Sequence, residues 1–255
     1  MTSRMRRALV TGGGSGLSAG IAAALAADGF GRVAITYRSS KPDATLAAIE
    51  RAGAAATAAR IDFSGDAGAI AAELEKLVRE AGPFDTLVHG VGALAVKRFV
   101  NLTRGDYERL FDANVRSAVL ACAAVLPAMR EVRFGRIVVF GSNGSSETRP
   151  YRGFSLYQAS KSALVAFART LAVEEAEHGI TVNVIEPGDI RDKTQTREQA
   201  RSQASPIPRG RPGSFEDIAD VVRFLIAPER DFITGAVIAV TGGLTQADRR
   251  NAQHS

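Results

Sequence analysis

Residues 9–18 read Leu-Val-Thr-Gly-Gly-Gly-Ser-Gly-Leu-Ser, which is a short apolar strand followed by a glycine-rich turn and the start of a helix. Glycine lets the backbone turn tightly and approach a phosphate, and the unpaired N–H groups at a helix N-terminus attract anions. Any tight strand-to-helix turn also favours glycine. The position of this turn, at the first crossover of the chain, favours a dinucleotide-binding β-α-β unit.

The remaining sequence alternates short β-branched runs with longer alanine-rich segments. Strands are expected at 8–11, 32–37, 57–61, 86–88, 136–140, 181–186 and 237–240, and helices at 17–28, 44–52, 67–80, 106–130, 155–178 and 215–226. The strand runs are almost continuously apolar, as in strands covered on both faces. The alternation predicts one α/β domain over residues 1–255, with a Rossmann-type, doubly wound parallel sheet of about seven strands flanked by helices.

Composition and charge exclude several other classes of protein. The net charge of +5 comes from basic residues spread along the 255-residue chain, which indicates a solvated surface or one that attracts an anionic ligand, rather than a nucleic-acid site. The longest apolar run, residues 117–129, is shorter than the ~18 residues that cross a bilayer. Residues 1–7 are polar and basic, unlike a signal peptide. We therefore expect a cytoplasmic protein that binds neither nucleic acid nor membrane.

Cysteine and histidine are too few and too scattered for a disulfide framework or a metal site. The single cysteine, Cys122, lies in an apolar run, so we expect a buried thiol. His89, His178 and His254 have no partner at metal-ligand spacing, and no metal is expected.

Residues 189–212 interrupt the alternation of strands and helices. The segment contains three prolines and six basic residues, namely Arg191, Lys193, Arg197, Arg201, Arg209 and Arg211. It follows the carboxyl end of a predicted strand, where ligands bind in open α/β sheets. We expect a mobile lid, and an irregular surface loop is the alternative.

The end of the second predicted strand indicates which dinucleotide is bound. An acidic residue about 20 positions after the glycines usually holds the 2′-hydroxyl of NAD. Here Tyr37, Arg38 and Ser39 follow the strand, and no carboxylate precedes Asp43. Arg38 can form two parallel hydrogen bonds with a 2′-phosphate, so we expect NADP(H); a surface arginine at a strand end is the alternative.

The pair Tyr157 and Lys161 has the spacing of two side chains on one face of a helix, about one turn or ~5.4 Å apart. A phenol has a pKa of ~10, which is too high for efficient proton exchange at neutral pH. A nearby ammonium stabilises the phenolate and lowers that pKa. The spacing therefore suits an acid/base pair, although most such pairs are solvated helix faces.

Several of these motifs together resemble the short-chain dehydrogenase/reductase family. The turn at residues 11–16 matches the family's Thr-Gly-x-x-x-Gly, and residues 157–161 (Tyr-Gln-Ala-Ser-Lys) match its helix motif. Residues 135–142, Gly-Arg-Ile-Val-Val-Phe-Gly-Ser, look like the family's strand that ends in a catalytic serine. Residues 112–115, Asp-Ala-Asn-Val, look like the segment that supplies its asparagine. The resemblance extends from about Arg6 to Leu244.

The resemblance implies a role for each of four residues. Ser142 holds a substrate carbonyl, Tyr157 donates a proton, and Lys161 lowers the pKa of Tyr157 and holds the nicotinamide ribose. Asn114 kinks its helix and supports a water-mediated proton relay. Ser145 and Ser146 are the alternatives to Ser142. The implied cofactor contacts are Thr11, Gly12, Gly14, Ser15, Gly16, Leu17, Tyr37, Arg38, Ser39, Asp62, Phe63, His89, Gly90, Val91, Tyr157, Lys161, Pro187, Gly188 and Ile190.

The chain departs from the family pattern at several positions. Ser18 replaces the last glycine of the turn, and residues 89–92 read His-Gly-Val-Gly where the family has Asn-Asn-Ala-Gly. Asp192 stands where the family often has threonine, and the interval from Ser142 to Tyr157 is two residues longer than usual. Asp62 is expected to contact adenine, but it could equally cap its strand.

The resemblance implies an NADPH-dependent carbonyl reductase, similar to 3-oxoacyl-acyl-carrier-protein reductases of fatty acid biosynthesis. Of the two basic positions expected to dock the carrier protein, Arg133 matches one and His178 occupies the other. A general ketone, sugar or polyol dehydrogenase is the alternative enzyme, and a catalytically idle NADP-binding sensor or scaffold is the alternative of another class. Apolar faces on the helices at 106–130 and 155–178 suit a homo-oligomer, a dimer or more specifically a homotetramer.

Overall fold

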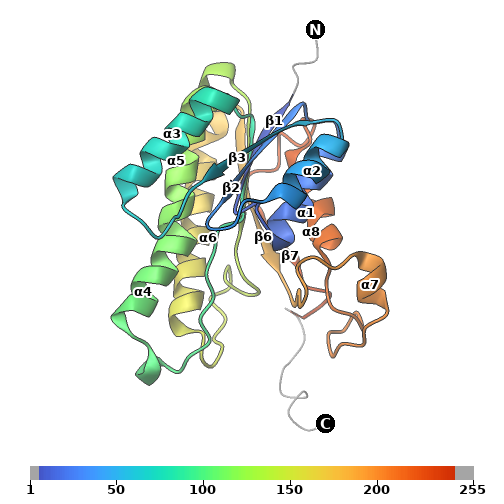
Figure 1. Ribbon diagram of the computed structural model, residues 1–255. Coiled ribbons are helices and arrows are strands. Elements are labelled where there is room, and N and C mark those ends of the chain that lie inside the picture. Colours follow the sequence, from blue (N-terminus) through green and yellow to red (C-terminus); the bar gives the residue numbers. More distant parts are fainter. Residues whose placement is uncertain (1–5, 245–255) are drawn as a thin grey trace.

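The sheet is the frame of the molecule. The structure, a computed structural model, describes residues 6–244, so residues 1–5 and 245–255 of the predicted domain lie outside the described part. Within this part the strands form one parallel sheet in the order β3-β2-β1-β4-β5-β6-β7 (Figure 1). The bounds are β1 Arg7–Thr11, β2 Arg32–Tyr37, β3 Ala55–Arg60, β4 Thr86–His89, β5 Gly135–Phe140, β6 Ile180–Pro187 and β7 Val237–Val240. The predicted doubly wound α/β fold is confirmed.

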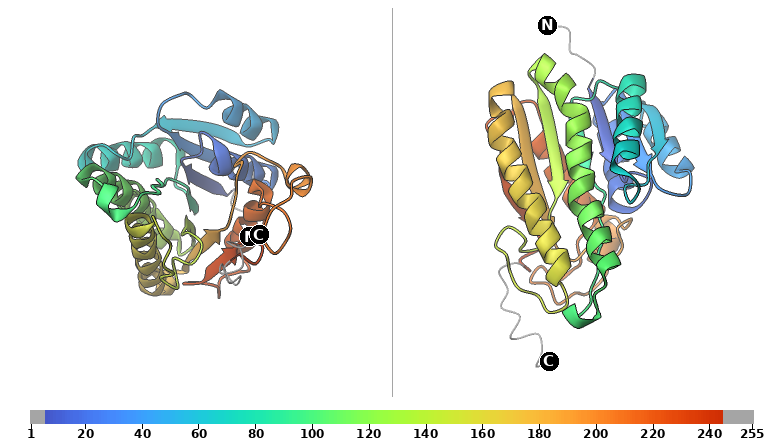
Figure 2. Two further views of the ribbon diagram at one scale, coloured as in Figure 1. Left: turned by 90° about the horizontal axis from the view of Figure 1, so that it is seen from below. Right: turned by 90° about the vertical axis from the view of Figure 1, so that its left-hand side faces the viewer.

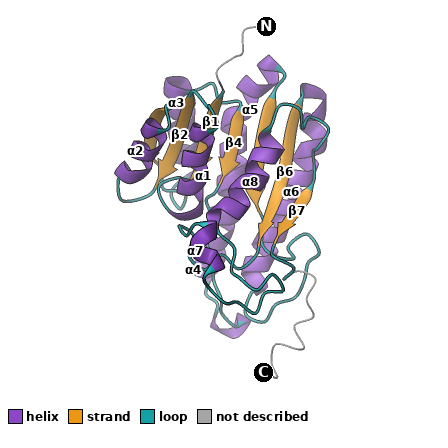
Figure 3. Cartoon of the chain, turned by 90° about the vertical axis from the view of Figure 1, so that its right-hand side faces the viewer, coloured by secondary structure: helices purple, strands orange, loops and turns teal. Residues whose placement is uncertain are grey.

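Helices cover both faces of the sheet. Their bounds are α1 Gly16–Ala27, α2 Asp43–Arg51, α3 Ala67–Ala81, α4 Arg104–Phe111, α5 Ser117–Val132, α6 Ser155–Glu175, α7 Arg197–Arg201 and α8 Phe215–Ile226. Short helical turns lie at Phe99–Asn101, Asp112–Arg116 and Ala176–His178. Helices α1, α2 and α8 lie in front of the strands in Figure 3, and α3, α5 and α6 cover the other face (Figures 2 and 3).

The strands are almost continuously apolar because successive side chains enter two different cores. In β1, Leu9 packs with α3, α5 and α6, whereas Val10 packs with α1 and α8 on the opposite face. In β5, Ile137 and Val139 belong to the first core and Val138 to the second. A strand with one face in water would instead alternate apolar and polar residues.

The segment from α4 to α5 is one long helical element with a π-helical turn, Asp112–Arg116, in its middle. By length and composition alone the combined helix Arg104–Val132 could cross a membrane. Core helices pass the same test, and here Ala118, Val125 and Met129 are buried against the sheet. We therefore interpret it as a core helix of the domain.

The strand order changes direction between β1 and β4, and this places a crevice at their carboxyl ends. Thr11 and His89, the last residues of the two strands, lie opposite each other in register. The loops and α7 gather at this edge of the sheet, below the strand ends in Figure 3. Tyr157 and Lys161, on the first two turns of α6, also lie toward this edge.

Candidate active site

The glycine turn after β1 has the shape that a bound dinucleotide requires. Gly12 and Gly16 have φ values of +69° and +60°, a region that favours glycine. A Cβ on Gly12 would lie 3.2 Å from the carbonyl carbon of Gly90, and one on Gly14 would lie 2.9 Å from Cβ of Tyr37. The N-cap of α1, Ser15, makes no side-chain hydrogen bond to the helix, so the N-terminal N–H groups keep their capacity for an anion.

Two departures from the family pattern, Ser18 and Gly90, are sterically linked: the Ser18 side chain fills the space that a side chain at position 90 would need. Ser18 is buried on α1, and a Cβ on Gly90 would lie only 1.9 Å from its Oγ. A side chain at position 90 therefore cannot coexist with the serine unless one of them moves. The loss of a glycine at position 18 is matched by the gain of one at position 90, so the close approach of α1 to the loop after β4 is retained.

His89 joins the glycine turn to the π-helical turn through a chain of hydrogen bonds. Its Nδ1 lies 2.8 Å from Thr11 Oγ1, and its Nε2 lies 2.9 Å from Ser117 Oγ. Ser117 donates its hydrogen to the carbonyl of Ala113, and Thr11 Oγ1 accepts from the N–H of Gly90. These partners assign the proton to Nε2. Burial, and secondarily the charge of Lys161, lowers the pKa of His89 to about 3.

This network gives His89 the hydrogen-bonding role of the asparagine that it replaces. A neutral imidazole, fixed by both of its nitrogens, positions the loop that carries Gly90 and Val91. The ring of Phe63 packs edge-on against it with the centroids 6.2 Å apart, so the Phe63 side chain belongs to the buried interior.

The carboxyl ends of β2 and β3 form a basic surface. Tyr37 of β2 pairs with Arg60 of β3, and the guanidinium of Arg60 donates to the carbonyl of Arg38 over 3.1 Å. Ser64 donates two hydrogen bonds to Asp62 and lowers the pKa of its carboxyl, an effect to which the charges of Arg38 and Arg60 add. Asp62 therefore caps the loop after β3. Arg60, which sequence reasoning missed, doubles the positive charge at this end of the sheet.

Tyr157, Ser142 and Lys161 come together at the carboxyl end of β5. Lys161 is buried, and its Nζ donates to the carbonyl of Phe140 over 2.7 Å. Burial lowers the pKa of Lys161 to about 8, with a smaller contribution from the charge of Lys193. Burial raises the pKa of the Tyr157 phenol, and a hydrogen bond with Ser142 opposes part of that increase.

The net direction of the Tyr157 pKa in this structure is upward, and the predicted lowering by Lys161 stays a prediction. Removing the half-buried phenol from water disfavours the phenolate and dominates its pKa. A phenol with a raised pKa keeps its proton at neutral pH, so the proton that Tyr157 would donate is present on the residue before a reaction begins.

Asn114 is buried in the π-helical turn and bonds the loop after β4. Its Oδ1 accepts from the N–H of Ala93, and its Nδ2 donates to the carbonyl of Ala93 and to Ser160 Oγ, all over 2.9 Å. A Cβ on Gly92 would lie 3.0 Å from Asn114 Oδ1 and 3.4 Å from Lys161 Nζ. The amide and the ammonium thus both lie beside the position that a Cβ of Gly92 would take. The expected kink takes the form of the π-helical turn.

The loop that carries Ser142 is held by a buried carboxylate that sequence reasoning missed. Glu186 on β6 accepts from the N–H of Gly144 (3.1 Å), the hydroxyl of Ser145 (2.7 Å) and the N–H of Ser146 (2.6 Å). Ser145 Oγ in turn accepts from the N–H of Ser142. A carboxylate within an apolar strand requires buried partners, and that signal was present in the sequence. Ser145 and Ser146, the alternatives to Ser142, thus serve this anchor.

Gln158 controls the hydroxyl of Ser142. Ser142 Oγ donates to Gln158 Oε1 over 3.0 Å, and both side chains are buried. A hydroxyl has one hydrogen to donate, so Gln158 competes with a bound carbonyl for it.

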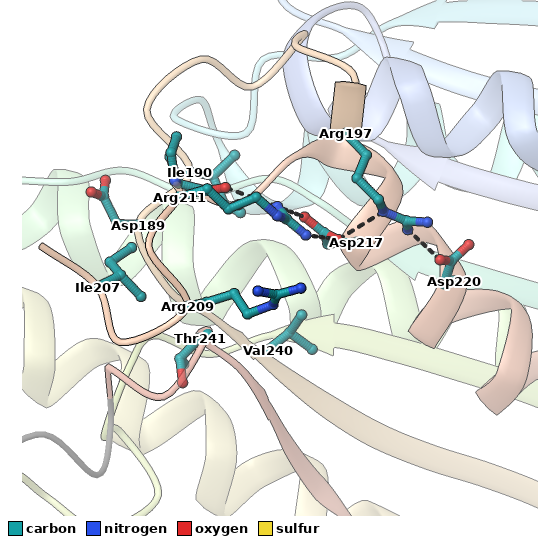
Figure 4. A pocket seen from close by; sticks show the side chains of 13 residues that line it. Asp189, Ile190, Arg197, Ile207, Arg209, Arg211, Asp217, Asp220, Val240 and Thr241 are labelled. Atoms are coloured by element: carbon teal, nitrogen blue, oxygen red, sulfur yellow. Dashed lines mark hydrogen bonds and ion pairs between the residues drawn. The ribbon is translucent and has the colours of Figure 1, made fainter. Parts of the chain in front are cut away.

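The segment 189–212 crosses the carboxyl edge and is tied to α8. Arg197 forms ion pairs with Asp217, over 3.0 Å, and with Asp220, and Arg211 forms a two-bond pair with Asp217 (Figure 4). Near its start, Gly188 donates to the carbonyl of Val240 over 3.0 Å. A cavity of about 270 Å³ lies between the segment, α8 and β7. The segment is thus anchored at several points, and its predicted mobility stays a prediction.

The other groups singled out in the sequence lie away from this centre. Cys122 is buried in α5, and burial raises the pKa of its thiol to about 12, as expected for an inert core cysteine. His178 lies 3.8 Å from Glu177 at the far end of α6, and His254 lies outside the described residues. Across residues 6–244, no cluster of three or more histidine, cysteine or acidic side chains could hold a metal ion.

Comparison with known proteins agrees with this geometry. A sequence profile described as enoyl-(acyl carrier protein) reductase matches residues 12–245. The 3-oxoacyl-[acyl-carrier-protein] reductase FabG of Escherichia coli (strain K12) is 32% identical over 240 residues, covering 93% of this chain and 96% of that protein.

Solved structures of similar proteins cover almost the whole chain. A crystal structure of acetoin dehydrogenase from Enterobacter cloacae has a TM-score of 0.86 at 28% identity and covers 97% of this chain and 98% of its own. A short-chain dehydrogenase/reductase from Serratia marcescens has a TM-score of 0.81 at 32% identity and covers 94% and 98%.

Proposed function

Since the chain belongs to the short-chain dehydrogenase/reductase family, we propose that it is an NADPH-dependent reductase of carbonyl compounds, with 3-oxoacyl thioesters as its substrate class. The observation that carries the proposal is the grouping of the Tyr157 phenol, the Ser142 hydroxyl and the buried Lys161 ammonium at the carboxyl edge of the sheet. This edge also carries the glycine turn. A proton donor and a dinucleotide cradle thus share one crevice.

The residues at this edge fit a nicotinamide dinucleotide. The turn from Gly12 to Gly16 and the N-terminus of α1 would hold the pyrophosphate, because the glycines let the turn pack closely against Gly90 and Tyr37 and the helix has no side-chain cap. Arg38 and Arg60 would hold the 2′-phosphate that distinguishes NADP from NAD. No carboxylate of β2 competes for that position, and Asp43 is paired with Lys41.

The remaining cofactor contacts follow the same path along the crevice. Phe63 contributes through its backbone, because its side chain is buried. The residues assigned along the path are Thr11, Ser15, Leu17, Tyr37, Ser39, Asp62, His89, Gly90 and Val91, with Pro187, Gly188 and Ile190 beside the nicotinamide.

Each catalytic side chain performs a role that its surroundings support. Bound NADPH supplies the hydride that the carbonyl carbon accepts. Tyr157 and Ser142 hold the carbonyl oxygen, and Tyr157 gives it a proton, which its raised pKa keeps on the phenol until the oxygen becomes basic. Lys161 holds the ribose hydroxyls and stabilises the phenolate left behind. Asn114, bonded to Ala93 and Ser160, positions the loop and helix on either side of a relay that returns the proton.

The thioester substrate class is supported by likeness to FabG and by surface charge. Arg133 ends α5 as an exposed cation beside the turn that contains His178, and it donates to the carbonyl of Glu177. This surface, at the amino ends of β5 and β6, would attract the acidic surface of an acyl carrier protein. The likeness to acetoin dehydrogenase supports a second candidate, a reductase of small ketones.

We place the enzyme in the cytoplasm as a homotetramer. Exposed apolar side chains on three neighbouring helices, Tyr107 of α4, Val119 of α5 and Val173 of α6, support self-association. Light scattering that shows only monomer would contradict this assembly.

A substrate panel with the Tyr157→Phe variant tests the function. Wild-type protein with NADPH is presented with acetoacetyl thioesters, acetoin-type ketones and sugars, and loss of reduced-nicotinamide absorbance is followed. We expect the fastest turnover with the thioester. Tyr157→Phe should reduce turnover by about 10²–10⁴-fold and leave NADPH binding, measured by fluorescence, unchanged. Binding of NADPH without turnover of any panel member would favour the idle binding protein instead.

A further inference from the structure

Lys193 extends across the entrance to the glycine turn. A Cβ on Gly16, the first residue of α1, would lie 3.3 Å from Cβ and 3.6 Å from Cδ of Lys193. The aliphatic stem of the lysine therefore passes over the N-terminus of α1, where the uncapped N–H groups favour an anion. The lysine comes from segment 189–212, far from this helix in the sequence.

The charge of Lys193 has no counter-ion within the described part of the chain, residues 6–244. Among residues 6–244 its ammonium takes part in no ion pair or side-chain hydrogen bond. Its neighbour Asp192 is engaged with Thr194, and Asp189 is paired with Arg191. The charge is close enough to Lys161 to contribute to the lowered pKa of that residue. Two cations thus face one crevice, and an anion bound between them would relieve their repulsion.

The turn that carries Lys193 is built to hold it in this place. Asp192 Oδ1 accepts from the N–H of Thr194 over 2.8 Å and from its hydroxyl over 2.6 Å, which closes a tight turn around position 193. The next residue, Gln195, is buried and donates to the carbonyl of Gly213 over 2.9 Å. The family's threonine is absent at position 192, and the carboxylate found there shapes the turn.

We propose that Lys193 binds the pyrophosphate of the dinucleotide from the side opposite the α1 N-terminus, so that segment 189–212 supplies a charged ligand to the cofactor site. This inference rests on the proposed function in one respect, that a nicotinamide dinucleotide binds in this crevice. Because NAD and NADP share the pyrophosphate, Lys193 strengthens the binding of both equally.

Titration of the full-length protein with NADPH and, separately, with NADH by fluorescence tests this assignment. Lys193→Gln removes the charge and keeps most of the stem. We expect both dissociation constants to rise by the same factor, roughly tenfold, which corresponds to about 1.4 kcal/mol of binding free energy. This value is near the lower end of the range for hydrogen bonds to charged groups, because Lys193 is exposed. Lys193→Arg should restore most of the affinity, and added salt should weaken wild-type binding more than Lys193→Gln binding.

Two matched variants separate this contact from other effects. Arg191→Gln removes the same charge from the same segment, but Arg191 is paired with Asp189, so both affinities should stay unchanged. Arg38→Ala should weaken NADPH and spare NADH.

Each result has one meaning for the assignment. Unchanged affinity in Lys193→Gln, or a loss confined to NADPH, would overturn the pyrophosphate assignment, and equal losses in Lys193→Gln and Arg191→Gln would reduce it to a general effect of charge. Failure of wild-type protein to bind either nucleotide would refute the proposed function itself. Unchanged circular dichroism checks that the variants are folded.

Discussion

Replacing Gly90 with alanine should destabilise the protein, because Ser18 already occupies the space that the new methyl group needs. The added Cβ would lie 1.9 Å from Ser18 Oγ, 3.0 Å from Ser18 Cβ and 2.9 Å from the carbonyl oxygen of Thr11. Non-bonded heavy atoms prefer separations of about 3.5–4.0 Å, so all three contacts are too short. The serine can rotate, but the Thr11 carbonyl belongs to β1 and cannot. Overpacking of this kind costs about 1–3 kcal/mol.

A second substitution isolates the Ser18 contribution. Ser18→Gly removes two of the three short contacts and leaves the one with Thr11, so the double variant should be more stable than Gly90→Ala alone. The rescue is partial, because glycine in a helix itself costs up to about 1 kcal/mol relative to alanine. We expect a coupling energy of at least about 1 kcal/mol between the two positions.

Thermal unfolding of the four proteins in the cycle measures this coupling. In a protein of this size, 1 kcal/mol shifts Tm by about 2–4 °C, so Gly90→Ala should unfold about 2–12 °C below wild type. Gly105→Ala is the matched control, because a Cβ there meets nothing closer than 3.8 Å and lies in α4, where alanine is favoured. Effects of Ser18→Gly and Gly90→Ala that add within about 0.5 kcal/mol would refute the steric pairing.

Two further predictions concern groups buried at the site. As the pH rises from about 8 to 10.5, the stability of wild type should increase relative to that of Lys161→Met. In this window the lysine of the unfolded chain still binds a proton that the native lysine has lost, because the pKa is lowered in the native state. Urea titrations at several pH values measure the difference in unfolding free energy, and a difference that does not vary with pH would contradict the lowered pKa. Glu186→Gln should lower kcat by about tenfold or more and leave the NADPH dissociation constant unchanged. An amide cannot accept all three hydrogen bonds that fix the Ser142 loop, and a donor left unpaired costs about 1–3 kcal/mol. Equal kcat values for Glu186→Gln and wild type would contradict that positioning role.

Local patterns in the sequence were sufficient for the fold and for much of the site. Apolar runs covered on both faces predicted the parallel sheet, and the glycines at residues 12–16 predicted the tight turn between β1 and α1. Tyr157 and Lys161 share one helix, so their spacing alone placed them about one turn apart. Each of these features depends on residues that are close in the chain, and the geometry of a single element therefore determines them.

The features that sequence reasoning missed or misjudged depend on residues that only folding brings together. The pKa of Tyr157 is raised because burial outweighs the hydrogen bond with Ser142, and burial is a property of the packed molecule. Ser18 compensates for Gly90, and Glu186 anchors the Ser142 loop, across different strands and helices. Lys193 reaches Gly16 from the segment that follows β6, although β4 and β5 separate β6 from β1 in the sheet. Contacts between distant segments follow from the packing of whole elements, and no local pattern of residue types encodes their distances.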